Sequence, residues 1–211
     1  MKKTVLLTIV MTAILALALS IGVFAADEAV TDTTTIGATE QATEQAPKLL
    51  SQVFNGGALA ILGAAVAVGL AGIGSAKGVG QVGEATAGLL SENPNQFGKA
   101  FLLMALPMTQ GIYGLVIAFL IVFKCGLFTE GGMDNLLALS VEEGAYYLMS
   151  ALPIGIVGMI SALKQARVSV SAINLHSKRP DQVMNAVTSA ALVETYAIFA
   201  LLISVLLVLI G

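Results

Sequence analysis

The stretch 182–211 reads QVMNAVTSAALVETYAIFALLISVLLVLIG and carries one charged residue, Glu194. A helix needs about 20 apolar residues to cross ~30 Å of hydrocarbon, and this run is longer. Charge-free runs of similar length lie at 4–26, 49–76, 100–123 and 144–163. Because lipid offers the backbone no hydrogen bonds, we expect each run to form a membrane helix.

The composition agrees with a membrane protein. Of 211 residues, 57% are hydrophobic and 11% charged, and the mean hydropathy is +0.91. A soluble domain has about 45–50% apolar and about 25% charged residues, so the composition argues against a soluble enzyme or a disordered protein. The chain has no phosphate-binding GxxxxGK[ST] motif and no pair of nucleophile and base, so we expect no catalytic site. Its ten Lys and Arg are scattered and Trp is absent, which argues against nucleic-acid binding.

The first part of the chain resembles a secretory leader. Lys2 and Lys3 precede an apolar core, and the small-residue motif Val23–Ala25 precedes Ala26. We therefore expect residues 1–25 to be a signal peptide, the alternative being an uncleaved N-terminal anchor helix. The polar residues 26–48 are expected to form a flexible tail outside the cytoplasm.

The remaining runs predict an all-α membrane protein with four transmembrane helices in two duplicated hairpins. The first hairpin is expected over 49–124 and the second over 144–211, with 125–143 as a loop outside the cytoplasm. Basic residues flank the turns at 91–98 and 176–182, namely Lys77, Lys99, Lys164, Arg167, Lys178 and Arg179. Because positive residues stay inside, we expect both turns to face the cytoplasm and the mature termini to lie outside.

The hairpins look like copies of one unit. Their turns read SENPNQ (91–96) and SKRPDQ (177–182). Gln110 follows Pro94 at nearly the same distance along the chain as Glu194 follows Pro180. We interpret Gln110 as the uncharged counterpart of Glu194.

The first helix of the first hairpin carries small residues at a four-residue spacing, namely Gly56, Ala60, Ala64, Gly72, Ala76, Gly80 and Gly88. In lipid, helices associate by close approach over small residues. A small face this long predicts packing against further copies of the chain in a ring.

Glu194 is the only acid within a hydrophobic run, and an ionisable group at that depth is costly and usually functional. In an antiparallel hairpin Gln165 meets Glu194 at the same depth, because the two residues flank Pro180 at nearly equal distances along the chain. Gln110 lies at nearly that depth, and Thr109 adds a hydroxyl. Together these residues form a set of hard oxygen donors, which suits a hard cation.

Two further residues complete this prediction. Pro107 removes an N–H and perturbs the backbone one turn before Gln110, so that a displaced carbonyl is expected to serve as a ligand. Tyr113 lies one turn after Thr109 and is expected to donate its hydroxyl to the carboxylate of Glu194, or else to be an ordinary packing aromatic.

The segments LVETYA (192–197) and LPMTQGIY (106–113) resemble the rotor-ring proteolipid of V-type ATPases, the bacterial and archaeal subunit K. The resemblance covers about residues 50–211. It implies a ring of identical subunits in lipid that turns against a stator membrane subunit and contacts central-stalk subunits at its cytoplasmic turns. ATP hydrolysis would take place in a soluble partner complex.

The resemblance also implies the ion. Sodium-carrying members bind Na⁺ through positions that match the Leu106 carbonyl, Thr109, Gln110, Gln165 and Glu194, with Tyr113 supporting the carboxylate. Proton-carrying members keep the Glu but generally lack the full polar set, so H⁺ is the alternative cargo. Met108 departs from the sodium pattern, in which this position is often small. A small secondary transporter is a third hypothesis.

Two residues outside this set bear reactive groups. Cys125 lacks a partner for an internal disulfide and is expected to be an apolar residue at a helix end. His176 lies next to a polar turn, and we expect it to be a solvated loop residue, the alternative being a contact or proton-relay residue. Lys164 and Arg167 flank Gln165 and are expected either to disturb the ion site or to extend toward the cytoplasm.

Overall fold

The computed structural model describes residues 55–211. The leader, the tail and the beginning of the first hairpin at residue 49 lie outside the described residues. Within them the helices are α3 (Gly56–Glu92), α4 (Phe97–Ala105), α5 (Thr109–Lys124), α6 (Gly132–Ala138), α7 (Val141–Lys178) and α8 (Val183–Ile210). Short 3-10 segments join some of them, namely η1 (Pro94–Gln96), η2 (Leu106–Met108) and η3 (Pro180–Gln182).

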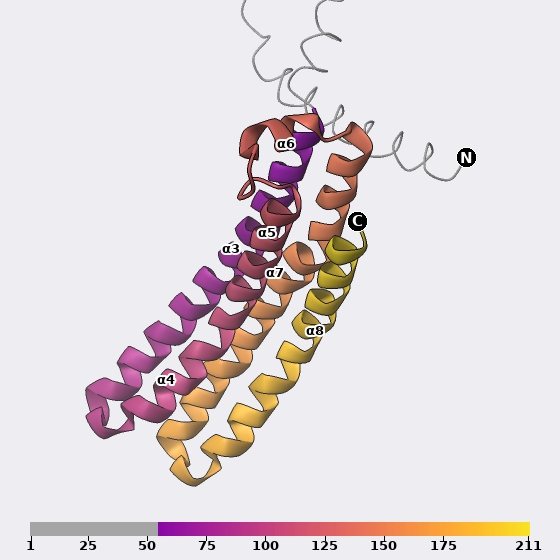
Figure 1. Cartoon of the computed structure of the whole chain (residues 1–211). Helices are drawn as coiled ribbons and strands as arrows, with labels where there is room; N and C mark the ends of the chain where they lie inside the picture. The colour runs from indigo at the N-terminus through magenta and orange to yellow at the C-terminus, as the bar shows by residue number, and fades with distance from the viewer. Residues whose placement is uncertain (1–54) are drawn as a thin grey trace, which may run out of the picture. The chain divides into compact units, whose positions relative to one another are not determined.

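Among residues 55–211, four helical segments are long and apolar enough to cross a membrane: Gly56–Glu92, Pro94–Lys124, Val141–Lys178 and Pro180–Ile210. They lie side by side as two hairpins, with both proline turns at one end and α6 at the other (Figure 1). The predicted fold class, an all-α membrane protein with four transmembrane helices in two hairpins, is confirmed.

The two turns have almost the same backbone geometry. Asn93 ends α3 with φ −138° and ψ 82°, and Arg179 ends α7 with φ −139° and ψ 79°. Each residue precedes a proline, which disfavours the helical conformation of the residue before it and so ends the helix there. A 3-10 turn then starts the return helix. The duplication read from the sequence therefore extends to the backbone.

Side-chain caps define where the first helix of each hairpin begins. The Oδ1 atom of Asn55 accepts a hydrogen bond from the N–H of Ala58 at 2.7 Å. Ser140 and Glu143 form a reciprocal capping box, in which the N–H of Glu143 donates to Ser140 Oγ at 3.2 Å and the N–H of Ser140 donates to Glu143 Oε2 at 2.8 Å. Helix α7 therefore starts at Val141, and the loop before it contains the short helix α6.

Helices α3 and α7 form the centre of the molecule because glycines let their backbones touch. A Cβ atom on Gly63 would lie 2.8 Å from the Cα of Leu148, and one on Gly74 would lie 2.6 Å from the Cα of Met159. Both contacts have the same offset in residue number, so the two helices run in parallel in one register. Helix α5 packs on α3 by the same means, since a Cβ on Gly114 would lie 2.5 Å from the carbonyl oxygen of Ala67.

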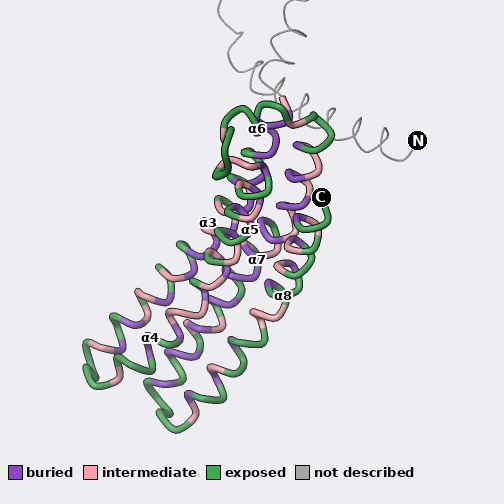
Figure 2. Tube along the Cα trace, viewed as in Figure 1, coloured by how far each residue is buried: buried purple, intermediate pink, exposed green. Residues whose placement is uncertain are grey.

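The small-residue face of α3 does not lie on one side of the bundle. Gly56, Ala60 and Ala64 are buried within the chain, whereas Ala76 and Gly80 are exposed. Figure 2 shows buried and exposed positions alternating along α3. Four residues turn a helix by about 400°, so a four-residue stripe drifts by about 40° at each step. The first half of this face packs inside the chain, so the prediction of packing against further copies applies to its second half.

His176 is a buried contact residue, and the expectation of a solvated loop histidine is wrong. It is 1% exposed, and its Nε2 atom lies 2.9 Å from Gln96 Oε1. Helix α7 continues to Lys178, so His176 lies in its last turn and faces the first hairpin rather than the turn. This hydrogen bond links the ends of the two hairpins.

The close α3–α7 contact gives a first prediction. Replacing Gly74 by Val should lower the free energy of unfolding by about 1–3 kcal/mol, because the new side chain would clash with the backbone of α7. The midpoint of helix loss, followed by circular dichroism during denaturation in detergent, would measure the change. Gly88→Val is the matched control, since a Cβ there meets no atom within 4 Å. An unchanged midpoint for Gly74→Val would contradict the packing described here.

Candidate ion-binding site within the membrane

The carboxylate of Glu194 lies between the two hairpins and is half-buried. The hydroxyl of Tyr113 on α5 donates to Glu194 Oε1 on α8 at 2.6 Å. A short hydrogen bond from a neutral hydroxyl stabilises an ionised carboxylate without adding charge to the membrane. The structure thus brings together the two residues that the sequence analysis paired.

A pair of buried glutamines lies next to this contact. Gln110 and Gln165 are both 0% exposed, and Gln110 Nε2 donates to Gln165 Oε1 at 2.7 Å. The Nε2 atom of Gln165 in turn donates to the carbonyl oxygen of Ala190 on α8 at 3.1 Å. Because α5, α7 and α8 each contribute one group, the amide chain fixes the relative depth of three helices.

The perturbed backbone at Pro107 supplies further oxygen atoms. Residues Leu106–Met108 form a 3-10 turn between α4 and α5. Thr109 Oγ1 donates to the carbonyl oxygen of Leu106 at 2.8 Å and lies 3.4 Å from Gln110 Oε1. The Leu106 carbonyl, the Thr109 hydroxyl and the Gln110 amide oxygen therefore lie close together at one break in the helix.

The residues of this site do not form a conventional metal cluster. Among residues 55–211 no three His, Cys, Asp or Glu side chains lie close enough to hold a metal ion. The site instead combines one carboxylate with neutral oxygen atoms. Such a set carries a single negative charge, which one monovalent cation neutralises.

Three residues near the site point away from it. Met108 is 47% exposed on the outer surface of the helix. Lys164 and Arg167 are exposed on α7, whereas Gln165 between them is buried. Neither cation therefore enters the site, because successive residues on a helix point in directions about 100° apart.

Two serines at the site were missed by the sequence analysis. Ser75 Oγ accepts a hydrogen bond from the N–H of Gly111 at 2.7 Å, and Ser161 Oγ donates to the carbonyl of Val193 at 3.0 Å. They connect α3 to α5 and α7 to α8, next to Gln110 and Glu194 respectively. The signal that identifies them is their separation of 86 residues, the same as that of Pro94 and Pro180.

This separation corrects the assignment of counterparts in the two hairpins. Thr195 Oγ1 donates to the Leu192 carbonyl at 2.8 Å, which repeats the Thr109–Leu106 bond 86 residues later. In this register the counterpart of Glu194 is Met108, so the interpretation of Gln110 as its counterpart is wrong by two residues. A shift of two residues turns a helix by about 200°, which takes a side chain from the interior to the surface.

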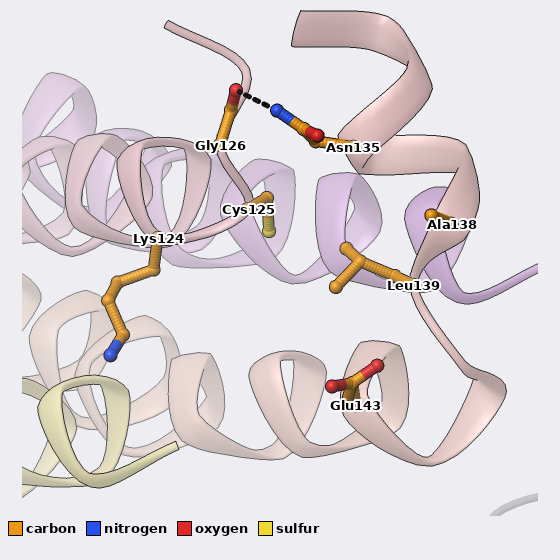
Figure 3. A pocket seen from close by; sticks show the side chains of 7 residues that line it. All are labelled: Lys124, Cys125, Gly126, Asn135, Ala138, Leu139 and Glu143. Carbon is orange, nitrogen blue, oxygen red and sulfur yellow. Dashed lines mark hydrogen bonds between the residues drawn. The ribbon is translucent and has the colours of Figure 1, made fainter. Parts of the chain in front are cut away.

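A separate pocket lies at the α6 end of the bundle and contains none of the predicted ligands (Figure 3). It has a volume of about 360 Å³ and is lined by Lys124, Cys125, Gly126, Asn135, Ala138, Leu139 and Glu143. Its polar groups already have partners within the chain: Lys124 Nζ is 3.4 Å from the Leu209 carbonyl, Asn135 binds the loop backbone, and Glu143 caps α7. Burial raises the pKa of the Cys125 thiol to about 11, which keeps it protonated at neutral pH and suits the expected role of an apolar helix-end residue.

Comparison with known proteins identifies the family. The family model for the C subunit of ATP synthase matches residues 62–121 and again residues 148–207. The chain belongs to this ATP synthase family. The two matched segments begin 86 residues apart and are equally long, which agrees with the register of the hydrogen bonds above.

Two relatives place this family member among the ring proteolipids of rotary ATPases. It is 45% identical over 156 residues to the V-type sodium ATPase subunit K of Enterococcus hirae, covering 74% of this chain and 94% of that protein. It is 34% identical over 149 residues to the A-type ATP synthase subunit K of Methanocaldococcus jannaschii, covering 71% of this chain and 61% of that one. The predicted V-type proteolipid is confirmed: the chain is a non-catalytic ring subunit of a rotary ATPase and a multi-pass membrane protein.

The buried glutamine pair gives a second prediction. Gln165→Leu should lower the free energy of unfolding by about 1–3 kcal/mol, because it leaves the amide of Gln110 and the carbonyl of Ala190 without their partner. Gln110→Leu combined with Gln165→Leu should be less destabilising than the sum of the two single changes. A double-mutant cycle on detergent-solubilised protein measures this coupling, and additive losses would show that the amides do not interact.

Proposed function

We propose that this protein carries one Na⁺ per chain and that ring rotation past a stator membrane subunit moves the ion across the membrane. The observation that supports sodium most strongly is the set of neutral oxygen atoms on α5 and α7, beside the contact of Tyr113 with Glu194. A proton needs only the carboxylate, whereas Na⁺ needs several oxygen ligands. The sodium ATPase named among the relatives supports the same choice, and H⁺ is the alternative cargo.

The proposed ligands are Glu194, the side-chain oxygens of Thr109, Gln110 and Gln165, and the carbonyl of Leu106, with Tyr113 holding the carboxylate. In the structure Gln165 Oε1 accepts a hydrogen bond from the Gln110 amide. An amide oxygen has two lone pairs, so Gln165 Oε1 can bind Na⁺ while it keeps this hydrogen bond. In this proposal the amide pair holds Gln165 Oε1 in place as a ligand, whether the site is loaded or empty.

The transport cycle follows from the cost of charge in lipid. An ionised Glu194 without a cation is unfavourable in hydrocarbon, so an empty site can leave the stator only after it has bound an ion. ATP hydrolysis would occur in the soluble sector. Central-stalk subunits that bind the turns 91–98 and 176–182 would transmit the resulting rotation to the ring. In this proposal the turns face the cytoplasm and the mature termini lie outside, and residues 1–25 are a signal peptide or an anchor.

The proposed assembly is a homomeric ring. On α3 Gly69, Gly72, Gly80 and Gly88 have no atom within 4 Å of an added Cβ. Helix α7 presents the counterparts of the first three, Gly155, Gly158 and Ala166, to α3 of the same chain. A second copy that places its α7 on the free face of α3 would repeat a contact that already exists within the chain. A secondary transporter, for which inverted repeats are typical, would not explain two parallel repeats.

A third prediction tests the ion. Sodium should protect Glu194 from a hydrophobic carbodiimide, because the reagent needs a protonated carboxyl group and bound Na⁺ keeps the group ionised. Thr109→Ala and Gln110→Ala should each raise the sodium concentration needed for half protection. The labelling rate is measured on the purified ring against sodium at fixed pH, with potassium as the balancing salt. A rate that follows pH and ignores sodium would favour the proton and leave the ring intact.

A fourth prediction separates transport from assembly. Glu194→Gln should abolish ion transport by the reconstituted ATPase while the ring still forms, because Glu194 supplies the charge and the small residues supply the packing. Transport is followed by ²²Na⁺ uptake into vesicles, and assembly by native mass spectrometry. Met108→Gln is a suitable control, since it alters the exposed counterpart position. Coupled uptake retained in Glu194→Gln would refute the assignment of the site.

A further inference from the structure

Two exposed charges of opposite sign lie on the helices that the ring proposal brings together. Arg167 on α7 and Glu84 on α3 are both exposed, and within residues 55–211 neither side chain makes a hydrogen bond or an ion pair. Arg167 follows Gln165 by two residues and so lies near the level of the ion site. An unpaired guanidinium at this depth would be costly in hydrocarbon, which calls for a partner outside the chain.

The duplication predicts how α7 of one copy meets α3 of the next. Each α3 residue has a counterpart on α7 that lies 86 residues later. A contact between α3 and α7 within the chain therefore predicts a contact between copies, in which both residues are replaced by their counterparts. Gly155 lies against Val66, since a Cβ on it would be 3.1 Å from the Val66 carbonyl oxygen. The equivalent contact between copies joins Leu152 to Gly69 of the next copy.

Both charges lie on the same edge of this contact. Arg167 lies two residues after Gln165, which binds α8, and therefore points about 200° away from α8. Glu84 lies nine residues after Ser75, which binds α5, and therefore points about 180° away from α5. In the proposed ring α3 and α7 form the inner layer, and α5 and α8 form the outer layer. The two side chains thus share the edge that faces away from α5 and α8, inside the ring.

The heights also agree. Within the chain Gly74 contacts Met159, a difference of 85 residues, which is one less than the repeat length of 86. Replacing both residues by their counterparts gives a difference of 87 residues between copies. Arg167 then lies level with Gly80 of the next copy, and Glu84 is four residues, ~6 Å, further along α3. An arginine side chain spans this distance. The Cβ of Glu84 also points toward the N-terminal end of α3, which is the direction of Arg167.

We propose that Arg167 of each copy forms an ion pair with Glu84 of the next copy, on the inner edge of the ring. The inference rests on the ring proposed above and adds the residues that select the neighbour and its register. Small residues let the two helices approach, and the ion pair then fixes their relative height because a displaced copy would leave both charges unpaired.

Charge reversal tests this fifth prediction on the purified ring. Arg167→Glu and Glu84→Arg should each accelerate dissociation of the ring in dodecyl sulfate, by about fivefold if each pair contributes as much as a strong exposed ion pair. The double reversal should restore the dissociation rate toward that of the unaltered ring. Lys178→Glu combined with Glu84→Arg is the matched control and should give no restoration, because Lys178 lies three helical turns beyond Arg167.

A disulfide between copies separates failure of the ion pair from failure of the ring. In a Cys125→Ser chain, Gly69→Cys with Leu152→Cys should give a ladder of covalent oligomers on oxidation. If the ladder forms and the ring of the double variant dissociates as fast as those of the single variants, the proposed ion pair is wrong and the proposed ring is supported. If neither the ladder nor a homomeric oligomer is found, the proposed ring is wrong and this inference fails with it.

Discussion

A single carboxylate in the hydrocarbon constrains the rest of this structure. Glu194 cannot remain charged and unpaired in lipid, so its surroundings must either neutralise it or solvate it. Tyr113 provides a hydrogen bond, and the neighbouring amides, hydroxyl and carbonyl provide oxygen atoms. Most of these groups belong to residues 106–113, and Gln165 adds one from α7. The packing of α5, α7 and α8 brings them to one depth.

Glycine is what makes that packing possible. The ligand groups are short, so α5, α7 and α8 must lie close to one another and to α3. Where α3 meets α7 and α5, a single methyl group on Gly74 or Gly114 would lie 2.5–2.6 Å from a backbone atom. Ser75 accepts a hydrogen bond from α5 and Ser161 donates one to α8, which fixes α5 to α3 and α8 to α7 at the level of the site.

The fold and most of the site could be predicted from the sequence because their signals are local. Charge-free runs specify membrane helices, and a proline after a polar residue specifies each turn. The depth of Gln165 and Glu194 follows from counting residues on both sides of Pro180. The pairing of Tyr113 with Glu194 follows from the place of Tyr113 one turn after Thr109, and the structure contains that hydrogen bond.

The predictions that were wrong concern the side of a helix on which a residue lies. Gln110 looked like the counterpart of Glu194 because its side chain is isosteric, yet the repeat aligns Met108 with Glu194. The small residues of α3 looked like one face, yet their spacing drifts around the helix. His176 looked solvated because its sequence neighbours are charged, although a helix that continues for two more residues places it against Gln96. Each error concerns which side of a helix faces a neighbour, and this depends on tertiary packing.

The aligned repeats also explain why the two hairpins contribute different atoms to one site. Gly78 packs against Pro107, where a Cβ would lie 2.9 Å from the proline Cβ, so α3 lies directly against the 3-10 turn that contains Leu106. In the second hairpin the counterparts of these two residues are Lys164 and Val193, and α8 continues without a break. In the proposed site the first hairpin therefore supplies the carbonyl of Leu106 and the oxygens of Thr109 and Gln110. The second hairpin supplies Gln165 and the charge of Glu194. A carboxylate at Met108 would have no such partner, since the counterpart of Gln165 on α3 is the apolar Val79. The first hairpin thus lacks both the carboxylate and its partner, which agrees with the proposal of one ion per chain.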